Sequence, residues 1–303
     1  MNKNNLYVET RAVHSSSIDQ TTGAIASPIH LSTTFERDED GEYSRGFEYI
    51  RDSNPNRIAL EECIAGLENG VEAVSFSSGM AAIMSILQCF KSGDHIILPD
   101  DMYFGARHLA NSTFSRYGFE FSFVDMTKLD DISHNIHNNT KLIWIETPSN
   151  PLIKVVDIVA ISNIAKMKNI LCCCDNTWST PIFSKPLDMG VDIVVHSSTK
   201  YFGGHCDAMN GVVVVRSESE FLENLKFIQK EGGAVPSPFD CWLVLRGIQT
   251  LPLRVKMQAT SALNIAKHLE QNPNVEKVYY PGLKTNEYHS LAKIQMKGFG
   301  AMM

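Results

Sequence analysis

Short apolar runs rich in β-branched residues alternate with segments of helical periodicity between about residue 71 and residue 235. Seven such runs are short enough to be buried strands, at Ala73–Phe76, His95–Leu98, Phe121–Val124, Leu142–Ile145, Ile170–Cys174, Ile193–Val195 and Val212–Val215. Helical periodicity is found at Met80–Phe90, Leu129–His137, Ile158–Met167 and Phe221–Gln229. Strands that alternate with helices predict an α/β fold, with a mostly parallel sheet covered by helices on both faces.

The pattern changes on both sides of this region. Residues 1–60 lack periodic runs and are rich in turn-forming residues, which predicts an irregular N-terminal arm. Residues 61–235 form the predicted α/β domain. Residues 236–303 are expected to begin a smaller α+β domain.

The smaller domain is predicted to open with a long helix at Phe239–Leu269, interrupted near Pro252. The segment Val275–Tyr279, a turn and a helix through Lys297 follow. The last residues, Gly298–Met303, are apolar and have the pattern of a strand that is only beginning. We therefore expect this domain to be incomplete.

Composition narrows the classes of protein. Hydrophobic residues make up 44% and charged residues 20%, as in an ordinary globular protein. The net charge of −7 comes without a basic stripe, so no nucleic-acid partner is expected. The polar N-terminus leads into no apolar signal region, and no run approaches the roughly 18 apolar residues of a membrane helix. We expect a cytoplasmic protein, which also suits its odd number of seven cysteines.

Three consecutive cysteines, Cys172-Cys173-Cys174, raise the alternative of a metal site. Neighbouring side chains on a strand point to opposite faces, so at most two of the three can reach one ion. No CxxC pair or nearby histidine completes a ligand set. Buried strand cysteines are the favoured interpretation, and no metal site is expected.

Three polar segments follow predicted strands, where ligands of open α/β sheets bind. The first, Ser77-Ser78-Gly79-Met80, opens a helix. Small residues at a helix N-terminus let backbone N–H groups approach an anion, although a plain helix cap is the alternative. The second is Asp175-Asn176-Thr177, whose carboxylate suits a helix cap, a metal ligand or the partner of a cationic ring nitrogen.

The third segment ends in Lys200 and follows the strand Ile193–Val195. Burial of an ammonium group is costly, and a desolvated lysine is a nucleophile toward carbonyl groups. Ser197 and Thr199 are two residues apart, so both hydroxyl groups can face one phosphate. The alternative is an ordinary surface lysine.

Together these segments supply a Schiff-base lysine, a carboxylate for a pyridinium nitrogen and a phosphate cup of Gly, Ser and Thr. An aldehyde-bearing pyridine phosphate requires this combination, and its ring then withdraws electrons from the substrate Cα. A nicotinamide-dependent oxidoreductase is a second candidate, but no strand is followed by the glycine fingerprint of such enzymes.

The motifs match a known family in combination. They are Glu48-Tyr49-Ile50-Arg51, Asn54-Pro55, Ser77-Ser78-Gly79-Met80-Ala81-Ala82, Asp100-Asp101-Met102-Tyr103, Glu146-Thr147-Pro148-Ser149-Asn150-Pro151, Asp175-Asn176-Thr177, His196-Ser197-Ser198-Thr199-Lys200-Tyr201 and Tyr280-Pro281-Gly282-Leu283. From about residue 10 onward the chain resembles the Cys/Met-metabolism enzymes that depend on pyridoxal 5′-phosphate. The resemblance implies fold type I of the enzymes that use this cofactor.

The resemblance also implies the role of each matching residue. Lys200 carries the cofactor and moves protons, and Tyr103 stacks on the cofactor ring. Asp175 pairs with the pyridine nitrogen beside Thr177, and Asn150 binds the 3′-oxygen. The phosphate ligands are Ser78, Gly79, Met80, Ser197 and Thr199.

In this family a Tyr-x-Arg pair from the N-terminal arm reaches the phosphate site of the neighbouring subunit. The pair here is Tyr49 and Arg51. The resemblance therefore implies a homo-oligomer, either a dimer or a tetramer.

The expected substrate is a sulfur-containing amino acid. The segments Phe47-Glu48-Tyr49, Gly233–Pro238 and Arg246–Leu251 are similar to those of γ-lyases and γ-synthases, which act on cystathionine or O-acylhomoserine. Trp178 and Asp207-Ala208-Met209 favour β-lyases instead, and methionine γ-lyase is a further alternative. Family members continue beyond the strand at Gly298–Met303 with an arginine that binds the substrate carboxylate. A catalytically impaired chain or partner subunit that keeps the cofactor fold is therefore the remaining hypothesis.

Overall fold

The computed structural model describes residues 6–15 and 18–303, and its strands form one seven-stranded sheet. The order is β1-β7-β6-β5-β4-β2-β3. The strands are β1 Glu72–Phe76, β2 His95–Pro99, β3 Glu120–Val124, β4 Thr140–Glu146, β5 Leu171–Asp175, β6 Ile193–His196 and β7 Gly211–Val215. Strands β2 to β6 pair in parallel, whereas β1 pairs with β7 in antiparallel register. All seven predicted strands and the mostly parallel sheet are confirmed.

The chain divides into two compact units. Unit 1 contains the described residues of Met1–Cys89 and His196–Leu251, and unit 2 contains Phe90–Val195 and Pro252–Met303. The predicted domains, divided at residues 60 and 235, are continuous stretches of the chain, whereas each of these units combines two separate stretches. The predicted division stays a prediction.

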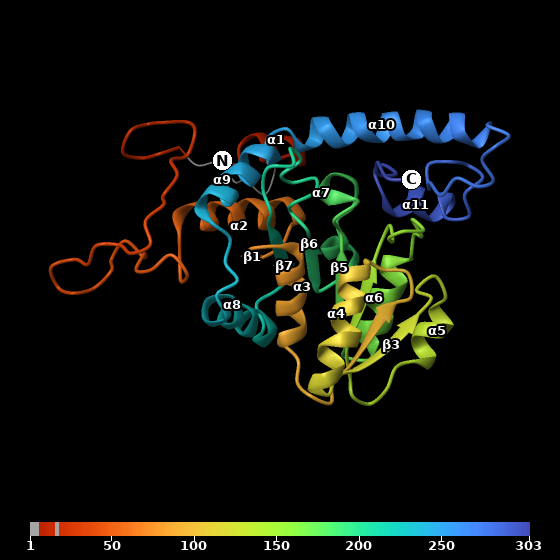
Figure 1. Ribbon diagram of the computed structural model, residues 1–303, viewed down its shortest axis with the longest axis horizontal. Coiled ribbons are helices and arrows are strands. Elements are labelled where there is room, and N and C mark those ends of the chain that lie inside the picture. The colour runs from red at the N-terminus through yellow and green to blue at the C-terminus, as the bar shows by residue number, and fades with distance from the viewer. Residues whose placement is uncertain (1–5, 16–17) are drawn as a thin grey trace. The chain divides into compact units, whose positions relative to one another are not determined.

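Unit 1 packs helices against the β1–β7 pair (Figure 1). Its helices are α1 Val8–Val13, α2 Pro55–Glu68, α3 Gly79–Gln88, α8 Glu220–Gly232 and α9 Pro238–Ile248. Helix α2 contacts α9, β1 and β7, while α3 contacts α8 and the same two strands. The sequence did not predict α2, although Pro55 occupies its first turn and the Asn54 side chain accepts a hydrogen bond from the Asn56 N–H.

The predicted irregular arm, residues 1–60, includes helix α1 and the first turn of α2, and the described segment between these helices is irregular. Residues 18–54 contain no helix, and their one β-bridge joins Thr34 to Tyr49. Most of the arm side chains are exposed, and Figure 1 shows the loops of this segment extending away from α2.

Unit 2 contains strands β2 to β5, and helix α6 packs against β4 and β5. The longest helix of this unit is α10. The helices of unit 2 are α4 Phe104–Ser112, α5 Leu129–His134, α6 Ile158–Met167, α7 Thr180–Phe183, α10 Leu251–Glu270 and α11 His289–Gln295. The predicted long helix is thus two helices, α9 and α10, with the break just before Pro252. Cys172, Cys173 and Cys174 are fully buried on β5, as the sequence predicted.

The expected start of a strand at Gly298–Met303 is not a strand. Val275–Tyr279 and Gly298–Met303 pair with no strand of the described chain, and extended backbone without a hydrogen-bonded neighbour does not form a sheet. Tyr280 is buried with Ala262 and Ala266 of α10, and its hydroxyl donates to the Gly300 carbonyl at 3.0 Å. Apolar packing on α10 therefore takes the place of the expected α+β structure.

No helix of the described ranges is long and apolar enough to span a membrane.

Candidate active site

The predicted site residues fall into two groups. The lysine group belongs to unit 1 and consists of Tyr49, Arg51, Ser78, Gly79, Met80, Ser197, Thr199 and Lys200. The ring group belongs to unit 2 and consists of Tyr103, Asn150, Asp175 and Thr177.

Helix α3 begins with two N–H groups that its own backbone does not use. The Ser78 hydroxyl accepts from the Ala81 N–H at 3.0 Å, and the Ser78 carbonyl accepts from the Ala82 N–H at 3.0 Å. The N–H groups of Gly79 and Met80 lie in the first turn, where the helix offers them no acceptor. Ser78 is therefore a helix cap, and Gly79 and Met80 present the donors that a phosphate needs.

Ser197 lies directly beside this helix N-terminus. A Cβ added to Gly79 would come within 2.8 Å of the Ser197 Cβ and 2.9 Å of its Oγ. A Cβ on Gly211, the first residue of β7, would be 2.2 Å from the Ser78 carbonyl oxygen. Glycine at both positions allows the serine hydroxyl, the helix start and β7 to approach one another.

The turn that carries Lys200 is fixed by its backbone. The Lys200 N–H donates to the Ser197 carbonyl at 3.1 Å, and the Gly204 N–H donates to the Lys200 carbonyl at 2.8 Å. The Thr199 hydroxyl donates to the Asn210 carbonyl at 3.1 Å and accepts from the Asn210 N–H at 3.0 Å. In this structure Thr199 therefore ties the turn to the start of β7, and its role as a phosphate ligand stays a prediction.

The side chain of Lys200 is exposed in the single chain, which corrects the expectation of a desolvated lysine. The turn is pressed against α9, since a Cβ on Gly247 would be 2.2 Å from the Gly203 carbonyl oxygen. The backbone is thus held firmly, while the amine reaches outward from it. A lysine presented in this way is accessible to an aldehyde.

A buried pair supports the strand that leads into the lysine turn. The Nε2 atom of His196, the last residue of β6, lies 2.6 Å from the Glu68 Oε1 atom at the end of α2, and both side chains are inaccessible to solvent. This contact fixes the end of β6 just before Ser197.

Tyr49 and Arg51 lie on the arm. The Tyr49 side chain is 40% exposed, and the Arg51 guanidinium lies 5.6 Å from the centre of the Tyr49 ring. The single chain therefore presents the two side chains together on a surface segment.

The ring group is built around Glu146, for which no role was predicted. Glu146 and Asp175 are register partners at the carboxyl ends of the parallel strands β4 and β5. The Tyr103 N–H donates to Glu146 Oε2 at 2.9 Å, and the Thr177 N–H donates to Asp175 Oδ1 at 2.9 Å. Tyr103, Asp175 and Thr177 thus gather around one buried carboxyl group.

The pKa of Glu146 is raised well above the ordinary 4.5, first by burial and then by the neighbouring Asp175 charge. Among the described residues, Glu146 Oε1 is buried without a hydrogen-bond partner. A neutral Glu146 accepts the hydrogen bond from the Tyr103 N–H without adding a second negative charge beside Asp175.

The loop after β4, which carries Asn150, is tied to the segment before Tyr103. The buried Ser149 hydroxyl donates to the Asp101 carboxylate and accepts from the Lys154 N–H at 2.9 Å. The Lys154 ammonium lies 3.3 Å from Asp100 and 3.8 Å from Asp125. Burial alone would lower the pKa of Lys154, but these carboxylates raise it and keep the ion pairs charged.

The sequence showed Asp101 and Ser149 as motif residues but did not predict that they bond to each other. The only signal was their position, since Asp101 lies two residues before Tyr103 and Ser149 lies directly before Asn150. The partner of a buried hydroxyl depends on loop geometry that a motif does not encode.

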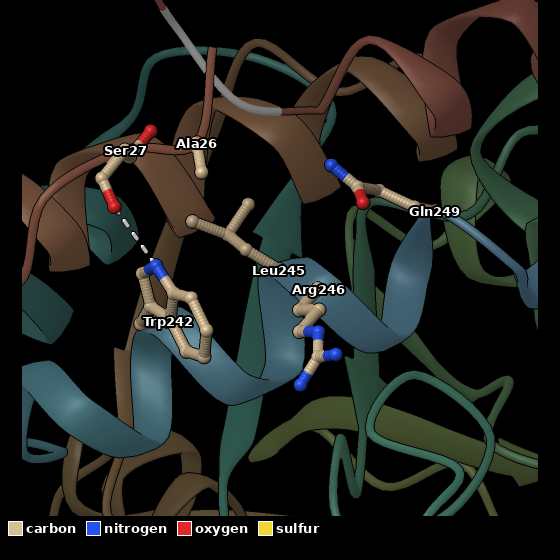
Figure 2. Close-up of a pocket in the computed structure, with 6 residues that line it drawn as sticks. All are labelled: Ala26, Ser27, Trp242, Leu245, Arg246 and Gln249. Atoms are coloured by element: carbon tan, nitrogen blue, oxygen red, sulfur yellow. Dashed lines mark hydrogen bonds between the residues drawn. The ribbon is translucent and has the colours of Figure 1, made fainter. Parts of the chain in front are cut away.

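A small cavity in unit 1 lies apart from the predicted residues (Figure 2). Its volume is about 110 Å³, below the roughly 300 Å³ at which ligand pockets begin. The lining residues are Ala26, Ser27, Trp242, Leu245, Arg246 and Gln249. None of them belongs to the lysine group or the ring group, so this cavity is not the predicted cofactor site.

The residues of the two groups fit pyridoxal 5′-phosphate chemically. The Gly79–Ser197 contact makes a phosphate cradle that a larger side chain at position 79 would fill. Lys200 supplies an accessible amine, and Asp175 supplies a carboxylate that the Thr177 N–H orients. These are the groups that the cofactor's phosphate, aldehyde and ring nitrogen require.

Known proteins show the same sequence pattern and the same fold. The chain is 42% identical over 304 residues to a cystathionine beta-lyase of Coxiella burnetii, covering 100% of this chain and 78% of the relative. It is 44% identical over 301 residues to a cystathionine gamma-lyase of Dictyostelium discoideum, covering 99% and 78%. A crystal structure of cystathionine gamma-lyase from Lactobacillus plantarum complexed with L-serine superposes with a TM-score of 0.94 at 40% identity, over 98% of this chain and 77% of that one.

The expected resemblance and fold type I are both confirmed by these comparisons. The sequence model of the Cys/Met metabolism PLP-dependent enzymes matches residues 9–303, where PLP is pyridoxal 5′-phosphate. The chain belongs to the Cys/Met metabolism family of PLP-dependent enzymes.

Proposed function

We propose that the two groups of residues bind pyridoxal 5′-phosphate through the lysine turn and the N-terminus of α3. The observation that carries this proposal is the Ser197 hydroxyl beside Gly79, next to the two N–H groups that α3 leaves without acceptors. Gly79, Met80 and Ser197 bind the phosphate, and Ser78 and Thr199 shape the site around it. Lys200, three residues after Ser197, binds the aldehyde carbon.

The ring group orients the cofactor. Asp175 holds a proton on the pyridine nitrogen, Asn150 donates to the 3′-oxygen, and Tyr103 stacks on the ring with Thr177 beside it. When bound, the cofactor withdraws electrons from the substrate Cα. Lys200 Nζ would take the Cα proton, pass it to the bound cofactor and only then take a Cβ proton. The γ-substituent would leave with its bonding electrons and pick up a proton.

The proposed reaction is γ-elimination or γ-replacement on cystathionine or O-acylhomoserine. Relatives named cystathionine gamma-lyase and probable cystathionine gamma-synthase are 44% and 43% identical to the chain. The segments Gly233–Pro238 and Arg246–Leu251 support the same substrates. A lyase releases 2-oxobutanoate and ammonia, whereas a synthase adds cysteine at the γ-carbon.

β-Elimination is the second candidate. Relatives named cystathionine beta-lyase are 42% and 45% identical, and Trp178 after Asp175-Asn176-Thr177 favours this reaction. The PLP-loaded chain incubated with cystathionine distinguishes the two. We expect 2-oxobutanoate and cysteine, while pyruvate and homocysteine would overturn the γ-assignment. O-acylhomoserine with cysteine then separates synthase from lyase, and methionine tests methionine γ-lyase activity.

We further propose a homo-oligomer in the cytoplasm, in which the arm of one subunit places Tyr49 and Arg51 at the phosphate of the next. Exposed apolar side chains on the arm support an oligomer, among them Ile25 at 79% and Leu31 at 68% exposure. The odd number of seven cysteines suits a reducing compartment. Light scattering on the purified chain tests the assembly.

A further inference from the structure

Arg57 in the first turn of α2 binds the part of the arm that carries Tyr49 and Arg51. Its side chain is 3% exposed. The guanidinium donates to three consecutive backbone carbonyls, at 3.0 Å to Ile50, 3.2 Å to Arg51 and 2.6 Å to Asp52. An arginine fork suits this task because its donors point in fixed directions from one plane.

These three carbonyls belong to a turn that precedes α2. The N–H groups of Asp52 and Ser53 both donate to the Tyr49 carbonyl, at 2.9 and 3.0 Å. Carbonyls in such a turn belong to no helix or sheet ladder, and a buried carbonyl needs a hydrogen-bond donor. The Arg57 cation satisfies them, so it fixes the direction in which Tyr49 and Arg51 leave the body of unit 1.

The other end of the arm is held by neighbouring residues. The Asn56 side chain accepts from the His30 N–H and donates to the Pro28 carbonyl, each at 2.8 Å. The Trp242 indole of α9 donates to the Ser27 carbonyl at 2.9 Å (Figure 2). The first turn of α2 and one side chain of α9 thus fix both ends of an otherwise exposed loop.

The loop between these ends is otherwise held by contacts near the surface, among them the Lys230–Asp52 ion pair at 3.4 Å and the Phe35–Phe47 ring contact. The Phe35 N–H donates to the Glu48 carbonyl at 3.0 Å, and the Ile50 N–H donates to the Thr33 carbonyl at 2.9 Å. Such a short ladder is marginal in water without support from packing. We therefore expect the orientation of Tyr49 and Arg51 to depend mainly on Arg57, which is buried.

We infer that Arg57 is a positioning residue for the neighbouring subunit's cofactor site, acting through the backbone of residues 50–52. This inference rests on the proposed contact of Tyr49 and Arg51 with the phosphate in the next subunit. Its consequence is specific: loss of the Arg57 fork weakens a site in the partner subunit, while the cofactor site of the same subunit stays intact.

The test uses Arg57→Lys, which keeps a positive charge at position 57. Burial raises the pKa of Glu61, and the charge at position 57 opposes that rise. A lysine cannot donate to three carbonyls in the geometry of the fork. Cofactor affinity is measured from the visible absorbance of lysine-bound pyridoxal phosphate. We expect affinity to fall at least tenfold in the Arg57→Lys homo-oligomer and to stay within twofold of wild type for Arg37→Lys, whose side chain bonds to Tyr43.

Hybrids then decide in which subunit Arg57 acts. Arg57→Lys chains are co-expressed with Lys200→Ala chains under two tags, and oligomers carrying both tags are isolated. Only the Arg57→Lys subunits retain Lys200, and their sites receive an intact arm from the Lys200→Ala subunits. We expect wild-type affinity to return at these sites. Affinity as weak as in the homo-oligomer, or no loss in the homo-oligomer, would overturn the inference.

A parallel hybrid of Arg51→Ala with Lys200→Ala tests the underlying proposal separately. The first outcome to consider is that the Arg51→Ala homo-oligomer binds the cofactor weakly and this hybrid does not recover the affinity. The arm then does not serve the neighbouring site, and the proposed assembly is wrong. If the Arg51→Ala hybrid recovers cofactor affinity and the Arg57→Lys hybrid does not, only the positioning role is wrong.

Should Arg57→Lys be isolated unfolded, Arg57→Gln takes its place. Trypsin cleavage after Arg45 gives an independent readout, expected to be at least fivefold faster in the Arg57 variant.

Discussion

The lysine turn and the loop after β4 are both short connections at strand ends, but they are held in different ways. The lysine turn is fixed by backbone hydrogen bonds and by glycines at positions 79, 211 and 247, which admit other atoms at very close distances. The loop after β4 is fixed by buried carboxyl groups, through Asp101 to Ser149 and through Glu146 to Tyr103. Added volume should therefore disrupt the lysine turn, whereas loss of a hydrogen bond or a change of pH should disrupt the loop.

The largest effect is expected from added volume at the start of β7. The Cβ of Gly211→Ala would meet the Ser78 carbonyl at 2.2 Å and the Gly79 Cα at 2.7 Å, and both are backbone atoms that cannot rotate away. We expect a loss of about 2–4 kcal/mol in unfolding free energy and at least a tenfold loss of cofactor affinity. Urea denaturation and cofactor titration measure the two.

Gly66→Ala is the matched control for this substitution. Gly66 lies inside α2, and its added Cβ meets nothing within 4 Å. The variant should be more stable than wild type by about 0.5–1 kcal/mol, because alanine favours the helix. Equal effects of the two substitutions would show that close contact does not fix the lysine turn.

A smaller effect is expected when the loop after β4 loses its buried hydroxyl. Ser149→Ala leaves the Asp101 carboxylate and the Lys154 N–H without their partner. Each buried unsatisfied group costs about 1–3 kcal/mol, so unfolding free energy should fall by about that amount. The exposed Ser133, which bonds only to a carbonyl of its own helix, serves as the control; Ser133→Ala should stay within about 0.5 kcal/mol.

The smallest effect, confined to a pH window, is expected from Glu146→Gln. Burial, with Asp175 second, raises the pKa of Glu146 above 4.5, so the unfolded chain releases this proton before the folded chain does. The folded state therefore loses stability as the pH rises from 4.5 through the raised pKa. Glutamine removes this loss and still accepts from the Tyr103 N–H.

Unfolding free energies measured from pH 4.5 upward test this sign. The difference, Glu146→Gln minus wild type, should become more positive as the pH rises and should be smallest near pH 4.5. A difference that does not change with pH would contradict a protonated Glu146. Asp188→Asn, on a surface turn of the same unit, provides the control for removing one carboxylate.

The sheet was predictable because its strands are short runs of buried β-branched residues that turn signals separate. The strand-end segments with Gly79, Asp175 and Lys200 followed from those strands. Helix α2 was missed because its N-terminal Asn54-Pro55 resembles a turn as much as a helix start. The apolar run Gly298–Met303 misled because apolar character does not reveal whether a strand has a partner.

Site details that depend on side-chain direction were beyond sequence reasoning. Nothing in the sequence distinguishes Arg57, which bonds to three backbone carbonyls, from Arg37, which lies exposed on the arm. The register that places Glu146 beside Asp175 exists only once β4 and β5 pair. The exposure of Lys200 likewise depends on the packing of the turn against α9.

The central claim is that Lys200 holds the cofactor, and the visible spectrum of the chain with added pyridoxal phosphate tests it most directly. We predict an absorption band that borohydride removes by reduction, leaving the cofactor attached to the protein, and we predict that this band is missing in Lys200→Ala. A peptide map of the reduced protein should place the attached group on Lys200. The same reducible band in Lys200→Ala, or no band in either protein, would contradict the assignment.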